Sequence, residues 1–373
     1  MAKLGEVCKV SASTKMIDKS KAWLLNLDMV EQQTGRVVEY NFVGEDGLNG
    51  SITQFDTENV LYSKLRPNLN KVVLPERNGF CTSELLPLRP DARKLDRSYL
   101  AVFLRSDGFV NWAVSKPAGA KMPRLGTKDL LNANIPLPEI KEQKAIAEKF
   151  KKTEELISLR KQQLVKLDEL VKARFVEMFD AISPKKCASK IGECAEVLGG
   201  YAFKSDCFSN QGVPVVRIGN INDGRIDIDY NTCYAEEFWN KNPRFQARKY
   251  DILMAMSGAT TGKVGIYKSD ERLLINQRVA CIRARDDESA IFLFACLQLP
   301  WMYNLVQEAS AGCAQPNISG KQIETMPVPK PETSKVHQFA AFVERVDQQK
   351  QTIQQSLEKL ELMKKVLMQE YFG

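Results

Sequence analysis

The chain has 373 residues and a formal net charge of +7, which is long enough for two domains with separate cores. Hydrophobic residues make up 44% and charged residues 27% of the sequence, as in folded globular proteins. The modest basic excess permits a nucleic-acid partner without demanding one, and no run approaches the roughly 20 apolar residues of a membrane span.

The cysteines and the single histidine narrow the possible chemistry. The nine cysteines form no Cys-x-x-Cys pair, which argues against a disulfide framework or a structural zinc site and favours a reducing, cytoplasmic location. His337 is the only histidine and lies in a segment typical of a helix, so we expect it at a surface or an interface. We therefore predict no Ser–His–Asp or Cys–His catalysis and no metal site.

The first globular module is expected over residues 1–140. Three short runs rich in β-branched residues are typical of strands, and the stretch after them is typical of helices; they cover residues 59–65, 71–75, 84–88 and 98–114. The module ends in the segment Ile135–Ile140, which cannot be helix interior because its prolines lack a backbone donor. These features predict a mixed α/β module with a stiff exit.

A long helix is expected next, over residues 141–180. Apolar side chains recur there at every seventh position, which is the pattern of a coiled-coil seam. This stripe consists of Phe150, Ile157, Leu164, Val171 and Met178. A helix of this length extends about 55 to 60 Å at 1.5 Å per residue, so one small domain cannot bury the whole stripe.

A second module is expected over residues 184–333, followed by a second long helix over residues 334–371. We predict four strands and two helices in the module: Val213–Gly219, Asp251–Ser257, Lys263–Lys268 and Arg278–Arg285, then Glu288–Gln298 and Trp301–Ala309. The second long helix again carries an apolar residue at every seventh position: Phe339, Val346, Ile353, Leu360 and Leu367.

The two modules are copies of one unit. The segment Pro123–Glu139 recurs as Pro316–Glu332 at an offset of 193 residues, with identities at five positions of a proline-punctuated loop. The same offset continues without a gap until Phe179 matches Phe372. A unit of roughly 180 to 190 residues has therefore been duplicated.

The two long helices are predicted to pack on each other. Two copies related by a pseudo-two-fold axis would pair their helices antiparallel, and this pairing buries both apolar stripes within one chain. The alternative is that each helix pairs with another chain. The predicted fold is α+β, with two similar globular domains joined by two long antiparallel helices that form a coiled coil.

Three segments look like enzymatic motifs but depart from them. Gly258–Val264 resembles a phosphate-binding loop, yet three residues stand where the loop needs four, and valine stands where it needs Ser or Thr. Asn242–Phe245 departs from the Asn-Pro-Pro-Phe motif of amino-methyltransferases at Arg244. Glu139 and Glu142 resemble a nuclease signature only in composition and lie at a helix start, where acidic residues are common. We therefore predict no catalytic residues.

Over its whole length the sequence resembles the specificity subunits of type I restriction–modification systems. The resemblance rests on the duplication and on five segments: Gly199–Phe208, Val213–Asp223, Asp251–Gly265, Ile275–Ala284 and Pro316–Pro331. The first copy departs from this pattern. It lacks the Gly-Gly-Tyr-Ala-Phe-Lys stretch, and it has Ser63–Lys71 where the second copy has Met256–Lys263.

This resemblance implies a non-catalytic chain that recognises double-stranded DNA. In the family, two target-recognition domains each read one half of a split sequence, while the paired helices fix the gap and dock two modification subunits. Those partners bind S-adenosylmethionine and methylate adenine, and separate restriction subunits use ATP and Mg to translocate and cut DNA. The resemblance thus implies that this chain itself binds no cofactor.

Lys and Arg on phosphates supply affinity for DNA, and polar side chains read base edges in the major groove. We take as candidate DNA-binding residues Lys64, Arg66, Lys71, Lys121 and Arg124 in the first copy, and Lys204, Arg217, Asn220, Arg225, Lys263, Gln277 and Arg278 in the second. The alternative function is a coiled-coil adaptor with tandem protein-binding domains and no role on DNA. Salt-dependent binding of duplex DNA distinguishes the two hypotheses.

Overall fold

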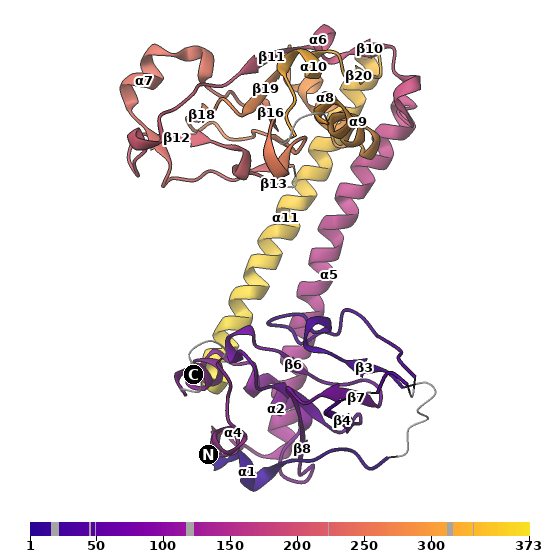
Figure 1. The fold of residues 1–373 in the computed structure, drawn as a ribbon, viewed down its shortest axis with the longest axis vertical. Helices are drawn as coiled ribbons and strands as arrows, with labels where there is room; N and C mark the ends of the chain where they lie inside the picture. Colours follow the sequence, from indigo (N-terminus) through magenta and orange to yellow (C-terminus); the bar gives the residue numbers. More distant parts are fainter. Residues whose placement is uncertain are drawn as a thin grey trace. The chain divides into compact units, whose positions relative to one another are not determined.

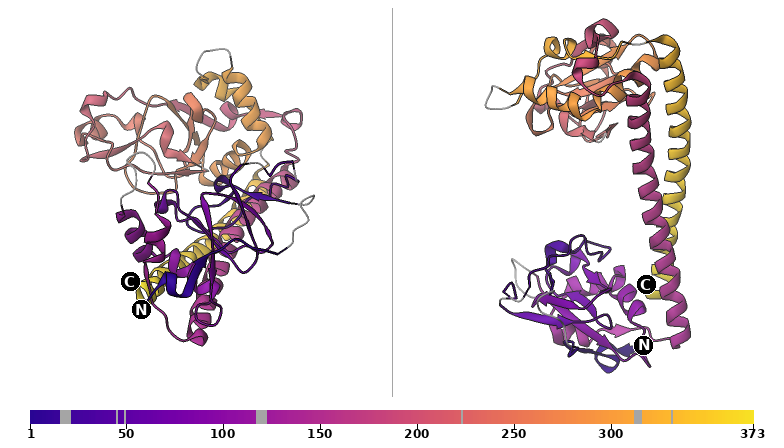
Figure 2. Two further views of the ribbon diagram at one scale, coloured as in Figure 1. Left: turned by 60° about the horizontal axis from the view of Figure 1, so that its bottom comes forward. Right: turned by 90° about the vertical axis from the view of Figure 1, so that its right-hand side faces the viewer.

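The computed structural model describes residues 1–15, 22–44, 46–48, 50–116, 123–222, 224–311, 316–330 and 332–373. The chain divides into two compact units. Unit 1 is Met1–Lys161 with Gln355–Gly373, and unit 2 is Gln162–Gln354. Each unit contains one domain of mixed strands and helices and one end of both long helices (Figure 1, Figure 2).

Domain 1, the globular part of unit 1, is built on a four-stranded antiparallel sheet. The strand order is β2-β8-β5-β6, with β2 (Cys8–Val10), β8 (Leu85–Pro90), β5 (Val60–Ser63) and β6 (Val72–Val73). A second sheet has the order β3-β7-β4, with β3 (Leu24–Leu25), β7 (Gly79–Thr82) and β4 (Ile52–Phe55). In this sheet β3 and β7 run parallel, whereas β4 and β7 run antiparallel.

Two capped helices follow the sheets of domain 1. They are α2 (Arg97–Leu104), which contacts β5, β6 and β8, and α3 (Asp107–Ser115). The Asp96 carboxylate caps α2 by accepting hydrogen bonds from two backbone N–H groups, and the Ser106 hydroxyl caps α3 by accepting one from the Phe109 N–H. The apolar face of α2 buries Leu100 and Phe103 in the core of the domain.

Domain 2, the globular part of unit 2, repeats this plan. Its four-stranded sheet has the order β11-β19-β16-β17, with β11 (Ala195–Gly199), β19 (Val279–Ala284), β16 (Ile252–Ala255) and β17 (Val264–Ile266). Its second sheet has the order β15-β12-β18, with β15 (Cys233–Tyr234), β12 (Val213–Val216) and β18 (Leu274–Ile275). The helices α8 (Asp287–Leu297) and α9 (Pro300–Ser310) follow. The four strands and two helices predicted for this module are confirmed.

The duplication is also visible in the small elements that close each domain. In domain 1 these are β1 (Ala2–Lys3), α1 (Leu4–Val7), α4 (Thr127–Leu131) and β9 (Asn134–Ile135). In domain 2 they are β10 (Ser189–Lys190), α6 (Ile191–Cys194), α10 (Gly320–Glu324) and β20 (Pro327–Val328). The first strand pairs antiparallel with the last in both domains, in matching register.

Several short elements complete the described residues. Domain 2 adds the hairpin β13 (Ile221–Asn222) and β14 (Arg225–Ile226), and the helix α7 (Glu236–Lys241). Single-turn 3-10 helices are η2 (Leu27–Met29), η3 (Pro67–Leu69), η4 (Pro184–Lys186), η5 (Ser205–Cys207), η6 (Ile218–Asn220), η7 (Pro243–Phe245) and η8 (Gly258–Thr260).

The long helices are α5 (Ile140–Phe179) and α11 (Thr333–Phe372), of 40 residues each. They run antiparallel within each unit. In unit 1 ion pairs join Glu154 to Lys364 at 2.7 Å and Lys161 to Glu361 at 3.1 Å. In unit 2 an ion pair joins Asp168 to Lys350. All ten residues of the two predicted apolar stripes are buried or half-buried.

Each domain core is completed by the C-terminal end of the helix that follows the other domain. Phe372 of α11 packs in the core of unit 1, with its ring 5.3 Å from Tyr99 and 6.3 Å from Phe150. Phe175 of α5 packs in the core of unit 2, 5.3 Å from Phe339. Both long helices are therefore part of the folding core of both units.

Among the described residues, no single helix is long and apolar enough to cross a membrane. Only α8 and α9 taken together, across a bend of 74°, reach the length and composition required.

Candidate nucleic-acid interface

Each domain carries an equivalent loop between two strands of its larger sheet. Loop A (residues 64–71) connects β5 to β6, and loop B (residues 256–263) connects β16 to β17. Each loop packs against a second segment, residues 123–125 for loop A and residues 316–318 for loop B. Loop A contains three of the candidates from the first copy, and loop B contains one from the second.

The backbone hydrogen bonds that hold the two loops are the same. The N–H of Arg66 donates to the Pro123 carbonyl at 2.8 Å, and that of Gly258 donates to the Pro316 carbonyl at 3.2 Å. The carbonyls of Lys64 and Met256 each accept at 2.9 Å from the opposing segment. The two loops therefore share one frame, although their sequences differ.

The two loops also share their turns. The backbone enters the left-handed region twice in each loop, at Arg66 (φ 49°) and Asn70 (φ 50°) in loop A, and at Gly258 (φ 78°) and Gly262 (φ 85°) in loop B. Glycine adopts this conformation without a steric cost, whereas other residues crowd the backbone there. The same fold of the loop is thus built with two glycines in one copy and with none in the other.

Three candidates of domain 1 come together at loop A. The side chain of Lys64 is half-buried, those of Arg66 and Arg124 are exposed, and a β-bridge joins residue 65 to Arg124. The guanidinium of Arg124 forms an ion pair with the Glu84 carboxylate at 2.8 Å. The result is a small surface of three cations and one carboxylate.

The remaining candidates of domain 1 lie differently. The Lys71 ammonium turns inward and donates to the Leu27 carbonyl. Burial lowers the pKa of Lys71, and the negative charge of Asp28 opposes that shift. This lysine is therefore engaged inside the domain in this structure. Lys121 lies outside the described residues.

In domain 2, Gln277 and Arg278 border loop B. The N–H of Gln277 donates to the Tyr201 carbonyl at 2.8 Å, and the Arg278 carbonyl accepts from Met256 at 2.9 Å. Both side chains are exposed, as is that of Lys263 at the end of loop B. These three candidates surround one edge of the domain.

Arg217 and Asn220 lie beside the same edge but have partners within the domain. Arg217 donates to the Thr232 hydroxyl at 3.0 Å and lies 3.5 Å from the Asp229 carboxylate. The Asn220 side-chain oxygen accepts from the Arg217 backbone N–H at 2.8 Å. Asn220 thus stabilises the turn that presents Arg217, and the guanidinium of Arg217 remains half-exposed.

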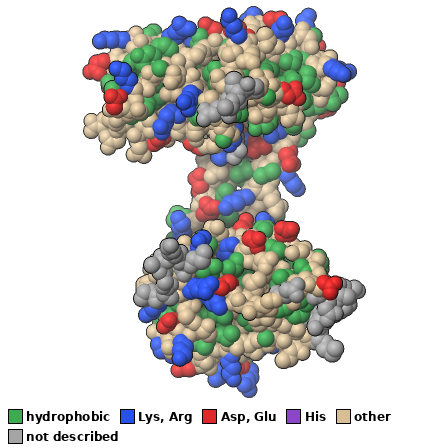
Figure 3. All heavy atoms as spheres, viewed as in Figure 1, with side chains coloured by type: hydrophobic (Ala, Val, Ile, Leu, Met, Phe, Trp, Pro, Cys, Tyr) green, Lys and Arg blue, Asp and Glu red, His purple; other side chains and the backbone are tan. Residues whose placement is uncertain are grey.

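The last two candidates are exposed, and among the described residues no hydrogen bond or ion pair joins either side chain to loop B. Lys204 precedes η5, and Arg225 lies on β14, whose neighbour Gly224 bridges to Gly265 of β17. The space-filling view shows Lys and Arg side chains spread over both domains (Figure 3). The charge on the visible face is therefore distributed and does not form a single patch.

Two features near loop B were not among the sequence candidates. Tyr201 is 37% exposed, and its ring contacts Phe203, Phe238 and Phe245 at centroid distances of 4.7 to 5.2 Å. In the sequence, the position of Tyr201 directly after Gly200 and three residues before Lys204 was the signal that could have identified it. The hydroxyls of Ser257 and Thr260 are buried without a hydrogen-bond partner among the described residues, a property that only the folded loop reveals.

A buried arginine connects loop A to the long helices. Arg105 donates to the Val72 carbonyl at 2.7 Å, and its own carbonyl accepts from the Asn70 amide at 3.0 Å. Its guanidinium lies 3.6 Å from Glu154 of α5, which pairs with Lys364 of α11. Burial lowers the pKa of Arg105, while Glu154 opposes the shift. Loop A is therefore linked to the helix pair through Arg105, by a hydrogen bond from Asn70 and an ion pair with Glu154.

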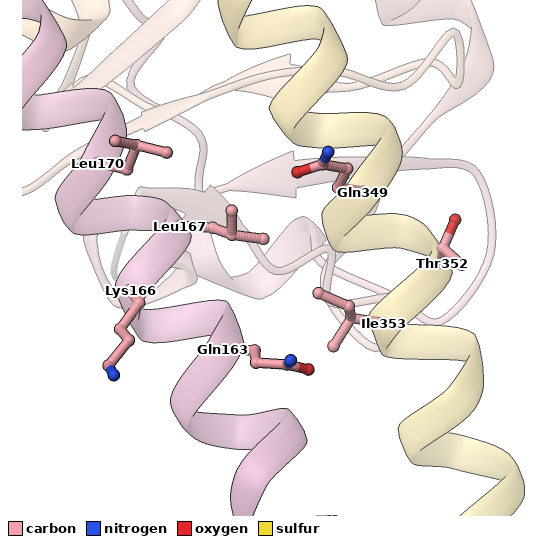
Figure 4. Close-up of a pocket in the computed structure, with 7 residues that line it drawn as sticks. All are labelled: Gln163, Lys166, Leu167, Leu170, Gln349, Thr352 and Ile353. Atoms are coloured by element: carbon pink, nitrogen blue, oxygen red, sulfur yellow. The ribbon is translucent and has the colours of Figure 1, made fainter.

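The helix pair itself has an open groove of about 570 Å³ in unit 2. Figure 4 shows Leu167 and Ile353 pointing toward each other across it. The full lining is Gln163, Lys166, Leu167, Leu170, Gln349, Thr352 and Ile353. The groove gathers no catalytic set, and within the described residues no group of three or more His, Cys, Asp or Glu could hold a metal ion.

Comparisons with known proteins agree with this architecture. The family model described as the type I restriction modification DNA specificity domain matches twice, at residues 1–169 and 185–362. The specificity subunit of the type I restriction enzyme MjaVIII from Methanocaldococcus jannaschii is 25% identical over 315 residues, which are 78% of this chain and 73% of that protein. The EcoDI specificity subunit from Escherichia coli is 30% identical over 117 residues, 31% of this chain and 26% of that protein.

Two solved structures are similar over the whole chain. One comes from a study of complex assembly and conformational transition in a type I restriction–modification system. It has a TM-score of 0.59 and 20% identity, and the match covers 100% of this chain and 96% of the other. The S subunit from M. genitalium has a TM-score of 0.59 and 14% identity, with 100% and 95% covered. At these identities the likeness concerns the fold.

Proposed function

This chain belongs to the type I restriction–modification DNA specificity family, and we propose that it reads a split DNA target with one half-site per domain. In this proposal the chain has no turnover of its own and acts in the cytoplasm. It supplies sequence recognition to modification and restriction subunits that carry out the chemistry.

The shared frame of loops A and B is the observation that carries the proposal. Two readers that approach the same kind of double helix need the same backbone geometry, and they need different side chains to prefer different bases. Loop A has Lys64 and Arg66 on that frame, whereas loop B has Met256 and Gly258 at the equivalent positions and the exposed Lys263 at its end. Conserved geometry with divergent chemistry is what reading two unlike half-sites requires.

The surroundings of the loops fit contacts with DNA. The edge of domain 2 at loop B exposes Gln277 and Arg278, a side-chain amide and a guanidinium that can pair with purine edges in the major groove. Exposed Lys and Arg side chains beyond these edges would contact phosphates and make binding salt-dependent. We propose these roles for the candidate residues whose cationic groups face solvent.

We further propose that the helix pair sets the gap between the half-sites and docks two modification subunits. Both helices pass without a break from one unit into the other. S-adenosylmethionine would bind to the modification subunits, which would methylate adenine. ATP and Mg would bind to the restriction subunits. No step of that chemistry is assigned to residues of this chain.

An exchange of domains tests the two-reader proposal. Residues 1–140 are replaced by the matching segment of another specificity subunit, and methylated sequences are mapped in a host that carries the partner subunits. Only one half of the mapped sequence should change. A change in both halves, or in neither, would contradict the proposal.

An insertion tests the role of the helices. One heptad is added to each helix at the border of the units, between Lys161 and Gln162 and between Gln354 and Gln355. The insertion lengthens each helix by about 10.5 Å, which equals roughly three base pairs. The mapped gap should widen by that amount while both half-sites persist, and an unchanged gap would contradict the spacing role.

A further inference from the structure

Arg66 occupies a backbone position that favours glycine. Its φ of 49° and ψ of 68° lie in the left-handed region, where the Cβ of an L residue crowds the neighbouring carbonyl. Loop B has Gly258 at the equivalent position. Arg66 also precedes Pro67, and a residue before proline normally adopts extended backbone. Loop A therefore keeps a large side chain where two separate steric rules disfavour it.

Among the described residues, no side-chain contact inside domain 1 explains why arginine stands at this strained position. Asn70, the other left-handed residue of loop A, is 6% exposed, and its amide donates to Gln33 at 3.1 Å and to the Arg105 carbonyl at 3.0 Å. Those hydrogen bonds explain why asparagine stands there. The side chain of Arg66 is exposed, and among the described residues its guanidinium makes no hydrogen bond, ion pair or ring contact. The guanidinium is therefore available to a partner outside the domain.

The surroundings of Arg66 favour an anionic or electron-rich partner. The backbone hydrogen bond to Pro123 places Arg66 beside Arg124, and Lys64 lies two residues before it. The carboxylate of Glu84 is paired with Arg124. No carboxylate among the described residues forms an ion pair with Arg66, so its five N–H donors remain available in a planar fork.

We propose that Arg66 is a specificity-determining residue of domain 1, which reads the O6 and N7 edge of a guanine in the first half-site. This inference rests on the proposed function. Arginine recognises that edge with two parallel hydrogen bonds. A cation that only contacted phosphate would serve both readers equally, whereas the second copy has glycine at this position. A residue present in one copy alone is placed to read what differs between the two half-sites.

Three variants test the proposal in the full chain assembled with its partner subunits. Arg66→Gly removes the fork and relieves the backbone strain, and Arg66→Lys keeps the charge without the fork. The matched control is Arg93→Gly, which removes a charge that is 90% exposed in the same domain. Arg93 lies in the turn before α2, away from loop A in the chain. Binding is measured on a library with randomised half-sites at several salt concentrations, and thermal melting is measured alongside.

We expect both Arg66 variants to lose discrimination at one base pair of the first half-site by about 5- to 150-fold. Reading of the second half-site and the melting temperature should be unchanged, the latter to about 2 °C. Arg66→Gly should not impair folding, because glycine adopts the observed φ with less strain than arginine does.

Other outcomes would overturn the proposal. If Arg66→Lys kept the wild-type discrimination between bases, the contact would be with phosphate. The same would follow if Arg66→Gly weakened binding to all sequences alike and reduced the salt slope by about one. An unchanged sequence preference would exclude any reading role for Arg66. The exchange of residues 1–140 separates these results from failure of the proposed function: if that exchange changes one half-site while the Arg66 variants do not, only the present inference fails.

Discussion

Loops A and B are held by the same backbone hydrogen bonds but carry different side chains. Loop B makes its two left-handed turns with Gly258 and Gly262, while loop A makes them with Arg66 and Asn70. The larger sheets around them have the same strand order. At this edge the two copies therefore share one backbone frame and differ in the side chains that it carries.

The smaller sheets of the two domains have diverged further. The parallel pair is kept, as β3 with β7 in domain 1 and β12 with β18 in domain 2. The third strand is added to opposite members of that pair, because β4 joins β7 whereas β15 joins β12. The larger sheet, the small closing elements and the long helices are therefore common to both copies, whereas the smaller sheet has diverged.

Both domains contain a buried ion pair in which equivalent arginines bind aspartates from different positions. In domain 2, Arg283 lies 2.6 Å from Asp251, directly before β16. In domain 1, the equivalent Arg89 lies 2.6 Å from Asp56, and Asn59 takes the position that matches Asp251. Each arginine thus pairs with a buried carboxylate, but in domain 1 the carboxylate comes from an earlier position of the segment before the strand.

The largest expected effect concerns the aromatic cores at the two ends of the helix pair. Phe339→Ala in unit 2 and Phe150→Ala in unit 1 each remove a ring that is fully buried. Each should lower the free energy of unfolding by about 3 to 5 kcal/mol. Hydrogen exchange should locate each loss in its own unit. Leu362→Ala, at a side chain that is 62% exposed, is the control, and equal losses in both units would contradict the division into two units.

The next effect concerns the buried ion pair of domain 2. Asp251→Asn leaves the Arg283 guanidinium, which is 14% exposed, without its countercharge. Removing one partner of a buried pair costs about 3 kcal/mol or more. Urea unfolding of the variant should show that loss, and the double variant Asp251→Asn with Arg283→Met should recover part of it. No recovery would mean that hydrogen bonds to the carboxylate matter more than its charge.

The sequence predicted the duplication, the strands of domain 2 and both long helices, because periodicity and proline punctuation are local signals. It did not predict the inward turn of Lys71, since the Leu27 carbonyl that accepts a hydrogen bond from its ammonium lies 44 residues away in the chain. The sequence also offered no reason to prefer Arg66 over the other eleven candidate DNA-binding residues. The left-handed backbone that distinguishes Arg66 has no local signal, because glycine is the residue that normally marks such a turn.

A smaller effect distinguishes the domains by pH. Burial raises the pKa of the Asp56 carboxyl, but hydrogen bonds from Ser13, Glu58 and Arg89 outweigh burial and hold it at about 2. A depressed carboxyl pKa stabilises the fold above the unfolded value near 3.8 and loses that contribution as pH falls toward 2. The stability difference between wild type and Asp56→Asn should therefore shrink between about pH 4 and pH 2. A constant difference over that range would refute the ionised state of Asp56.

The smallest effect concerns the ion pair between Asp168 and Lys350, with side chains 55% and 30% exposed. A double-mutant cycle with alanine at both positions should give a coupling energy of about 0.2 to 1 kcal/mol that declines with salt. The pair of Glu154 and Lys364, with side chains 34% and 27% exposed, should give a larger coupling because Arg105 shares the carboxylate. Equal couplings would argue against a shared network of Arg105, Glu154 and Lys364.

A chain with two identical readers tests the central claim most directly. Residues 1–140 are replaced by residues 188–333 of the same chain, so that domain 2 occupies both positions, and methylated sequences are mapped with the partner subunits present. Two modules that read independently should give a split target in which both halves are the present second half-site. Retention of the present first half-site would show that domain 1 does not read it, and would contradict the account.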